Sequence, residues 1–240
     1  PLSGKKIVLY EHSSVGRGII RGILEDLGAK VVTVARSEKF VSVDTESVTP
    51  YTRRLLRDWA KEYKPFAVIS LDGDSDRPLL ADENGEFLPG DKLGLLTVRA
   101  LQSIGTPIEF VAFPIASNSR IVTGLRGEGI TVELTKVGSP QVIDAMDKAI
   151  KAGKTGVVSW EANGGFLTGT DLVIRGNSLS KLPTRDAVLP LVLSLACTRL
   201  RMTSDRSPSS FSAVNFLSFT SGTSTCRSIL SKIGPESFFR

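Results

Sequence analysis

The most informative segment of this chain is Ile69-Ser70-Leu71-Asp72-Gly73-Asp74-Ser75-Asp76-Arg77-Pro78. Residues 66–71 are apolar and partly β-branched, which predicts a short buried strand that the following glycine, serine and proline end. Side chains two residues apart in an extended chain point the same way. We therefore expect Asp72, Asp74 and Asp76 to converge just past the C-terminal end of this strand, where open α/β sheets hold their ligands.

Three carboxylates packed this closely repel one another, and a hard divalent cation relieves the repulsion. Mg²⁺ takes oxygen ligands, so Asp72, Asp74 and Asp76 are predicted to ligate Mg²⁺. Arg77 adds a fixed charge and a planar donor fork that suits a phosphate. Residues 72–83 nearly match a calcium-binding EF-hand loop, but Arg77 stands where that loop requires glycine, and a strand is predicted before it. An Asp-Gly turn with solvated acids is the structural alternative.

The N-terminal segment is predicted to form a β-loop-α-β unit of the parallel-sheet class. Its expected elements are a strand at 5–10, a loop at 11–18, a helix at 19–27 and a strand at 30–35. The glycines near the turn (Gly16, Gly18 and Gly22) are wrongly spaced for a dinucleotide-binding fingerprint, which favours a tight strand-to-helix turn. His12 is the one histidine of the chain, and we expect it to have a structural or domain-contact role.

The order of strand, turn and helix repeats along the chain, which predicts two copies of one fold. We expect an α/β protein with two similar three-layer α/β/α domains and mostly parallel sheets. The predicted domains are a metal-loop domain at 1–107 and a second domain at 108–197. Residues 198–240 are rich in serine and of low complexity, which predicts an irregular or disordered tail.

Polar residues also follow the predicted strands of the second unit, and loops on a sheet scaffold are common places for function. Glu161 and Asn163 are flanked by glycines and are predicted to bind vicinal hydroxyls of a ligand, with a satisfied turn as the alternative. Lys136 is predicted to hold an anion, unless it is a solvated surface lysine. Arg185 is predicted to reach a ligand, and Asp186 to cap the apolar helix that follows.

Composition excludes several classes of protein. Apolar residues make up 41% of the chain and charged residues 23%, which is ordinary for a soluble globular protein. No apolar run reaches the roughly 18 residues of a membrane span, and two cysteines are too few for a disulfide framework. A cytoplasmic location without a membrane partner is the default expectation. The net charge of +5 comes from scattered residues, which argues against a nucleic-acid partner and suits phosphorylated anions.

The run from Asp72 to Asp91 resembles the metal loop of the α-D-phosphohexomutases, the phosphomannomutase and phosphoglucomutase enzymes. The resemblance spans residues 4–197 and is to the second and third of that family's four domains. It implies Asp72, Asp74 and Asp76 as Mg²⁺ ligands and Arg77 as a catalytic residue. Residues 160–165 resemble the sugar-binding loop, usually Gly-Glu-x-Ser-Gly-His, with Asn163 and Gly165 replacing the family's Ser and His.

This resemblance implies an isomerase of carbohydrate metabolism, an intramolecular phosphotransferase acting on a hexose phosphate. The phosphoryl group would move between C1 and C6 by way of an enzyme phosphoserine. The family's phosphoserine loop and its fourth-domain phosphate loop have no clear match here, so we expect a fragment that binds metal but turns over poorly alone. The alternatives are a non-catalytic sugar-phosphate or nucleotide-binding module and a dinucleotide oxidoreductase. The choice between mannose and glucose and the oligomeric state stay open.

Overall fold

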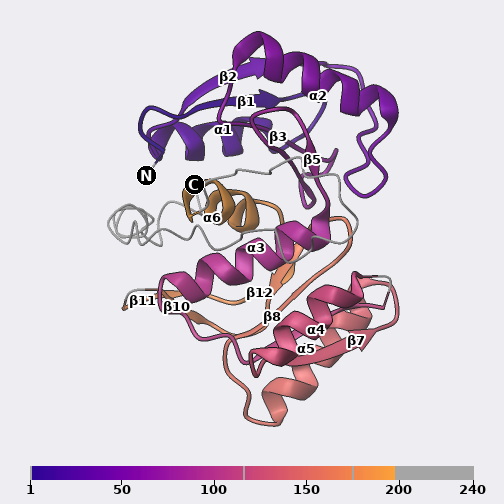
Figure 1. Ribbon diagram of the computed structural model, residues 1–240, viewed down its shortest axis with the longest axis vertical. Coiled ribbons are helices and arrows are strands. Elements are labelled where there is room, and N and C mark those ends of the chain that lie inside the picture. Colours follow the sequence, from indigo (N-terminus) through magenta and orange to yellow (C-terminus); the bar gives the residue numbers. More distant parts are fainter. Residues whose placement is uncertain (1, 116, 175, 198–240) are drawn as a thin grey trace.

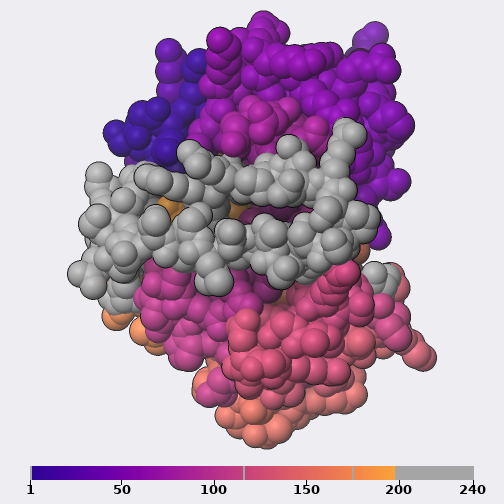
Figure 2. Space-filling model, in the orientation of Figure 1, coloured from indigo at the N-terminus to yellow at the C-terminus, as the bar shows by residue number. Residues whose placement is uncertain are grey.

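The computed structural model describes residues 2–115, 117–174 and 176–197, which form two α/β units (Figure 1). In the space-filling view the first unit, coloured indigo to purple, forms one end of the molecule and the second unit forms the other (Figure 2). No described helix combines the length and apolar character that crossing a bilayer requires. The predicted tail at 198–240 lies outside the described residues.

The first unit is a five-stranded sheet in the order β2-β1-β3-β4-β5. Its strands are β1 (Lys6–Tyr10), β2 (Lys30–Val34), β3 (Ala67–Leu71), β4 (Pro78–Ala81) and β5 (Phe87–Leu88), with helices α1 (Arg17–Asp26) and α2 (Pro50–Tyr63). Along β1, Ile7 packs in the cluster that contains α1 residues, whereas Val8 packs with Leu56 of α2. This alternation places one helical layer on each face of the sheet.

The second unit has the equivalent order β7-β6-β8-β9-β12. Its elements are β6 (Phe110–Pro114), α4 (Ser119–Gly127), β7 (Thr131–Thr135), α5 (Ser139–Lys151), β8 (Val157–Trp160), β9 (Phe166–Thr168), β12 (Leu182–Asp186) and α6 (Val188–Cys197), with a small hairpin of β10 (Leu172–Ile174) and β11 (Asn177–Leu179). Ala112 of β6 packs with α5, and its neighbour Phe113 packs in the cluster on the opposite face. The predicted pair of similar three-layer α/β/α units is therefore confirmed.

Each sheet is parallel on one side and antiparallel on the other. β1 pairs in parallel with β2 and β3, and β6 pairs in parallel with β7 and β8. The remaining strands pair antiparallel, because β4 and β9 return directly after the loops that follow β3 and β8. The sheets are thus mixed, and the predicted parallel arrangement describes the first three strands of each.

Helix α3 (Gly90–Ser103) lies between the sheets of the two units (Figure 1). It contacts β4 of the first unit and β8 and α6 of the second. Its buried hydrophobic residues belong to one cluster that contains Ile69 of β3 and Trp160 of β8. The proposed boundary at residue 107 therefore stays a prediction, since α3 packs against both units.

Candidate functional site

The loop between β3 and β4 holds the acidic triad Asp72, Asp74 and Asp76. One carboxylate oxygen from each lies within 4.8 Å of the other two. The loop folds back on itself, because the Asp72 N–H donates to the Arg77 carbonyl at 3.0 Å and the Asp72 carboxylate accepts from the Arg77 N–H at 3.0 Å. The structure thus brings together the three side chains that were predicted to converge.

The Arg77 side chain lies beside this triad. Its Nε is 3.7 Å from a carboxylate oxygen of Asp72 and 3.6 Å from Oδ1 of Asp76. These separations are ion-pair distances and are too long for strong hydrogen bonds. The side chain as a whole is 38% exposed, whereas its Nε is buried and has no hydrogen-bond partner in the part of the chain that the structure describes.

The electrostatics of the triad suit a divalent cation. Burial raises the pKa of Asp72 to about 6, the Arg77 N–H opposes that shift, and repulsion from Asp74 and Asp76 adds to it. Asp76 Oδ1 is buried without a hydrogen-bond partner. A cation with oxygen ligands would relieve the repulsion and satisfy this oxygen, so the residues present fit a hard divalent metal such as Mg²⁺ or Ca²⁺.

The loop after β8 faces the triad from the second unit. Glu161 is buried, and its Oε2 accepts a hydrogen bond from the Ser139 hydroxyl at 3.0 Å. Asn163 is also buried, and its side-chain oxygen accepts from the Gly165 N–H at 3.0 Å. The Asn163 carbonyl accepts from the Thr45 hydroxyl of the first unit at 2.9 Å. Residues 161–165, which we call the glutamate loop, are therefore fixed to both units.

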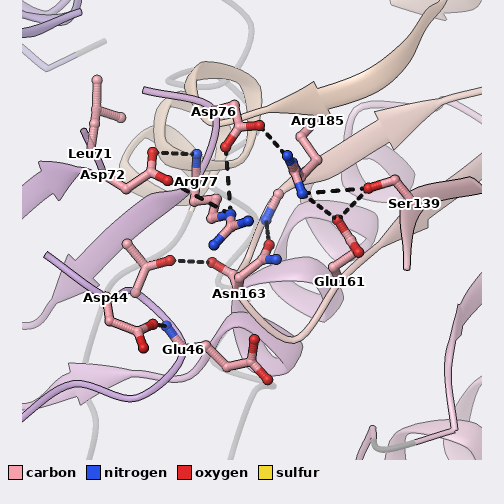
Figure 3. Close-up of polar contacts among 12 residues, drawn as sticks. Asp44, Glu46, Leu71, Asp72, Asp76, Arg77, Ser139, Glu161, Asn163 and Arg185 are labelled. Atoms are coloured by element: carbon pink, nitrogen blue, oxygen red, sulfur yellow. Dashed lines mark hydrogen bonds and ion pairs between the residues drawn. The ribbon is translucent and has the colours of Figure 1, made fainter. Parts of the chain in front are cut away.

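Arg185 of β12 joins the triad to the glutamate loop (Figure 3). Its Nε donates to Asp76 Oδ2 at 2.6 Å, and its Nη1 lies 3.4 Å from Glu161 Oε2. Nη1 also lies 3.5 Å from the Ser139 hydroxyl. One guanidinium thus links carboxylates from both units, and together these groups offer charges of both signs to a polar, anionic ligand.

The remaining residues singled out from the sequence are Lys136, which lies in a turn, and Asp186, which lies just before α6. Lys136 is exposed in the turn between β7 and α5, three residues before Ser139. Sequence reasoning missed Ser139, and the only available signal was its place in the Gly138-Ser139-Pro140 turn at the start of a helix. Asp186 accepts hydrogen bonds from the Val188 and Leu189 N–H groups, at 2.7 and 3.3 Å, and so caps α6 as predicted.

His12 has a structural role at the start of the acidic loop. It is fully buried, and its Nε2 donates to the Leu71 carbonyl at 2.7 Å. Burial lowers the pKa of His12, the hydrogen bond to Leu71 opposes that shift, and nearby Arg17 adds to it. A neutral, buried imidazole bound to backbone agrees with the structural role that was expected from the sequence.

Comparison with known proteins identifies relatives of both units. Residues 2–85 match the family model described as Phosphoglucomutase/phosphomannomutase, alpha/beta/alpha domain II, and residues 89–213 match the model of domain III. Over 194 residues the chain is 48% identical to a phosphomannomutase from Sinorhizobium fredii (strain NBRC 101917 / NGR234), covering 81% of this chain and 39% of that protein. It is 46% identical to a phosphomannomutase from Salmonella muenchen, with the same coverage of 81% and 39%.

Solved structures show the same fold. A phosphoglucomutase/phosphomannomutase family protein from Burkholderia thailandensis superposes with a TM-score of 0.57 at 16% identity, covering 80% of this chain and 40% of that one. An N-acetylphosphoglucosamine mutase from Aspergillus fumigatus, solved in complex with glucose 1,6-bisphosphate, gives a TM-score of 0.51 at 15% identity over 80% of this chain and 42% of that one. The chain spans about two fifths of the length of these relatives. It belongs to the phosphoglucomutase/phosphomannomutase family, of which it contains α/β/α domains II and III.

Proposed function

We propose that the acidic triad and the glutamate loop form the metal- and sugar-binding part of a phosphohexomutase active site. The reaction would move a phosphoryl group between C1 and C6 of a hexose phosphate. One observation carries the proposal: Arg185 contacts Asp76 at 2.6 Å and Glu161 at 3.4 Å, so one guanidinium joins the acidic triad to the glutamate loop.

Asp72, Asp74 and Asp76 would hold Mg²⁺, with Asp76 Oδ1 as the oxygen that has no other hydrogen-bond partner among the described residues. When bound, Mg²⁺ offsets the negative charge that develops on a transferring phosphoryl group. Arg77 would donate from its exposed side to the phosphoryl oxygens, a stabilisation that is strongest in the transition state. The phosphoserine that donates and recovers the phosphoryl group would come from outside residues 2–197.

The second unit would orient the sugar. The Glu161 carboxylate would accept hydrogen bonds from vicinal hydroxyls of the hexose, and the Asn163 amide would donate to them. Arg185 and the exposed Lys136 would contact the phosphate that is not being transferred. Family likeness supports this arrangement, since the phosphomannomutase relatives share 46–48% of the aligned residues.

A chimera tests the proposed activity. The 194 aligned residues of the Salmonella muenchen phosphomannomutase would be replaced by those of this chain, and glucose 1-phosphate and mannose 1-phosphate would be assayed by coupled turnover. We expect turnover that an Arg77→Met substitution abolishes, and no robust turnover from the 240-residue chain alone. A folded chimera as inactive as its Arg77→Met variant would favour a non-catalytic sugar-phosphate-binding module.

Arg185→Met should separate sugar-phosphate binding from metal binding. The substitution keeps most of the side-chain volume but removes the cation between Asp76 and Glu161. Because charged hydrogen bonds are worth roughly 1.5–3 kcal/mol, we expect the affinity for hexose phosphate to fall by at least about tenfold. Calorimetry should show Mg²⁺ binding that is unchanged or tighter. A loss of Mg²⁺ binding together with sugar-phosphate binding would mean that Arg185 only holds the site together.

The raised pKa of Asp72 predicts metal binding that depends on pH. Protons compete with the cation below about pH 6, so Mg²⁺ affinity should fall roughly tenfold as the pH is lowered from 7.5 to 5.

The folding stability of the metal-free chain should change with pH in the opposite direction. A carboxyl whose pKa is raised on folding makes its full contribution to stability below its unfolded pKa. This contribution is lost as the pH rises through about 6, the pKa of Asp72 in the folded chain. Calorimetry and thermal melts in EDTA at the two pH values check both signs.

A further inference from the structure

A second loop packs against the loop that carries the acidic triad. Residues 12–16, which we call the support loop, connect β1 to α1. β1 pairs with β3 in parallel, so the segments that follow the two strands emerge side by side. His12 binds the Leu71 carbonyl at 2.7 Å, and the Val15 N–H donates to the Gly73 carbonyl at 3.1 Å. The support loop therefore contacts the backbone at the end of β3 and in residues 72–77, which we call the metal loop.

The Ser75 side chain makes two hydrogen bonds with the support loop. Ser75 lies between Asp74 and Asp76 and has a φ of 71°, a left-handed conformation that is uncommon for residues other than glycine. Its hydroxyl accepts from the Gly16 N–H at 2.7 Å and shares a hydrogen bond with the Ser14 hydroxyl, also at 2.7 Å. These two bonds stabilise a backbone turn that sends the flanking aspartates toward one point.

The contact between the two loops is close and partly buried. A Cβ atom at Gly16 would lie 2.8 Å from both Cβ and Oγ of Ser75, so only glycine allows this approach. Ser14 is 1% exposed, so removing the Ser75 hydroxyl would leave the buried Ser14 hydroxyl without this partner. The pair is thus part of a built contact, distinct from the solvated hydroxyls that loops often carry.

We propose that Ser14 and Ser75 are positioning residues that set the geometry of the metal ligands. This inference rests on the proposed Mg²⁺ site. Mg²⁺ requires nearly ideal octahedral geometry with short bonds, whereas Ca²⁺ accepts longer and less regular coordination. A metal loop released from the support loop would keep its three carboxylates but lose the fixed spacing that Mg²⁺ needs.

The test compares serine variants of the 240-residue chain. Ser75→Ala removes the shared hydroxyl, Ser14→Ala removes its partner, and Ser75→Gly removes the hydroxyl while easing the left-handed backbone. Ser13→Ala is the matched control, because the Ser13 hydroxyl belongs to the same loop but bonds to the N–H and carbonyl of Val41 at 2.9 and 3.3 Å. Calorimetry with MgCl₂ and with CaCl₂ gives the two dissociation constants, and melts in EDTA give the stability of the metal-free chain.

We expect Mg²⁺ affinity to fall about three- to tenfold in Ser75→Ala and Ser75→Gly, and by a smaller factor in Ser14→Ala. Ca²⁺ affinity should change by about twofold at most, so the preference between the cations shifts. Ser13→Ala should leave both affinities as in the wild type. A lower melting temperature with an unchanged cation preference would overturn the inference and leave the pair with a purely structural role.

The same titrations separate this inference from the proposed function. If Asp74→Asn loses Mg²⁺ affinity while the Ser14 and Ser75 variants bind as the wild type does, the metal site stands and the positioning role is wrong. If the wild type and Asp74→Asn bind Mg²⁺ equally, the metal site itself is wrong.

Discussion

Gly94→Ala should lower the free energy of unfolding by about 2 kcal/mol or more. Gly94 lies on the buried face of α3, and a Cβ atom there would be 2.4 Å from two ring atoms of Trp160. The indole is fully buried and stacks on Phe113, with ring centroids 4.7 Å apart, and faces Phe166 at 6.4 Å. Since a rigid ring packed on both sides has nowhere to move, α3 itself would have to shift.

Gly124→Ala is the matched control for this prediction. Gly124 lies within the exposed part of α4, where an added Cβ would have nothing within 4 Å. Alanine has a higher helix propensity than glycine, so this variant should be more stable by about 0.5–1 kcal/mol. Chemical denaturation of both variants measures the difference. A Gly94→Ala chain as stable as the Gly124→Ala chain would show that α3 does not press on Trp160.

Gly94→Ala should also weaken ligand binding at the proposed site. Trp160 ends β8, and Glu161 follows it directly. Displacing the indole would therefore change the position of the glutamate loop relative to Arg185. We expect the variant, where it still folds, to bind hexose phosphate more weakly while keeping its Mg²⁺ affinity, because the acidic triad lies in the other unit.

Local sequence patterns predicted the parts of this structure that depend on neighbouring residues. The apolar run before Asp72 indicated β3, and the spacing of two residues indicated that the acids converge. The structure has both, with the triad atoms within 4.8 Å of one another. The repeated order of strand, turn and helix likewise predicted two similar units, because each copy carries the same alternation of apolar segments and turns.

Contacts between distant parts of the chain were not predictable in this way. Arg185 was predicted to reach a ligand, but its bond to Asp76 spans 109 residues of sequence. It depends on β12 joining the sheet antiparallel to β9, and no local pattern indicates that pairing. The segment after β1 was predicted to be a tight strand-to-helix turn, yet the hydrogen bond between its Ser14 and Ser75 spans 61 residues and follows from β1 lying beside β3.

Asp74→Asn should weaken Mg²⁺ binding by about 100-fold. Losing an outer partner of a metal ligand costs roughly 10–100-fold in affinity, and losing the charge of a ligand costs at least as much. Asp74 is the exposed member of the triad, so the amide replaces the carboxylate without leaving an unpaired group in the core. Isothermal titration calorimetry with MgCl₂ at pH 7.5 measures the change.

Asp147→Asn controls for the change in net charge. Asp147 is exposed on α5, so the control variant loses the same charge away from the triad. We expect it to bind Mg²⁺ as the wild type does, because Asp147 lies in the other unit and salt screens interactions between exposed charges that are not close neighbours. Equal weakening in both variants would mean that overall charge, and not a ligand, determines the affinity.

Asp74→Asn has a further consequence that metal-free protein can report. Burial is the main cause of the raised pKa of Asp72, and the charge of Asp74 adds to it. Removing that charge should bring the pKa of Asp72 closer to its ordinary value, although burial keeps it raised. The pH dependence of stability in EDTA should then flatten between pH 4 and pH 6. A variant that loses Mg²⁺ affinity but keeps the wild-type pH dependence would mean that Asp74 does not face Asp72 in solution.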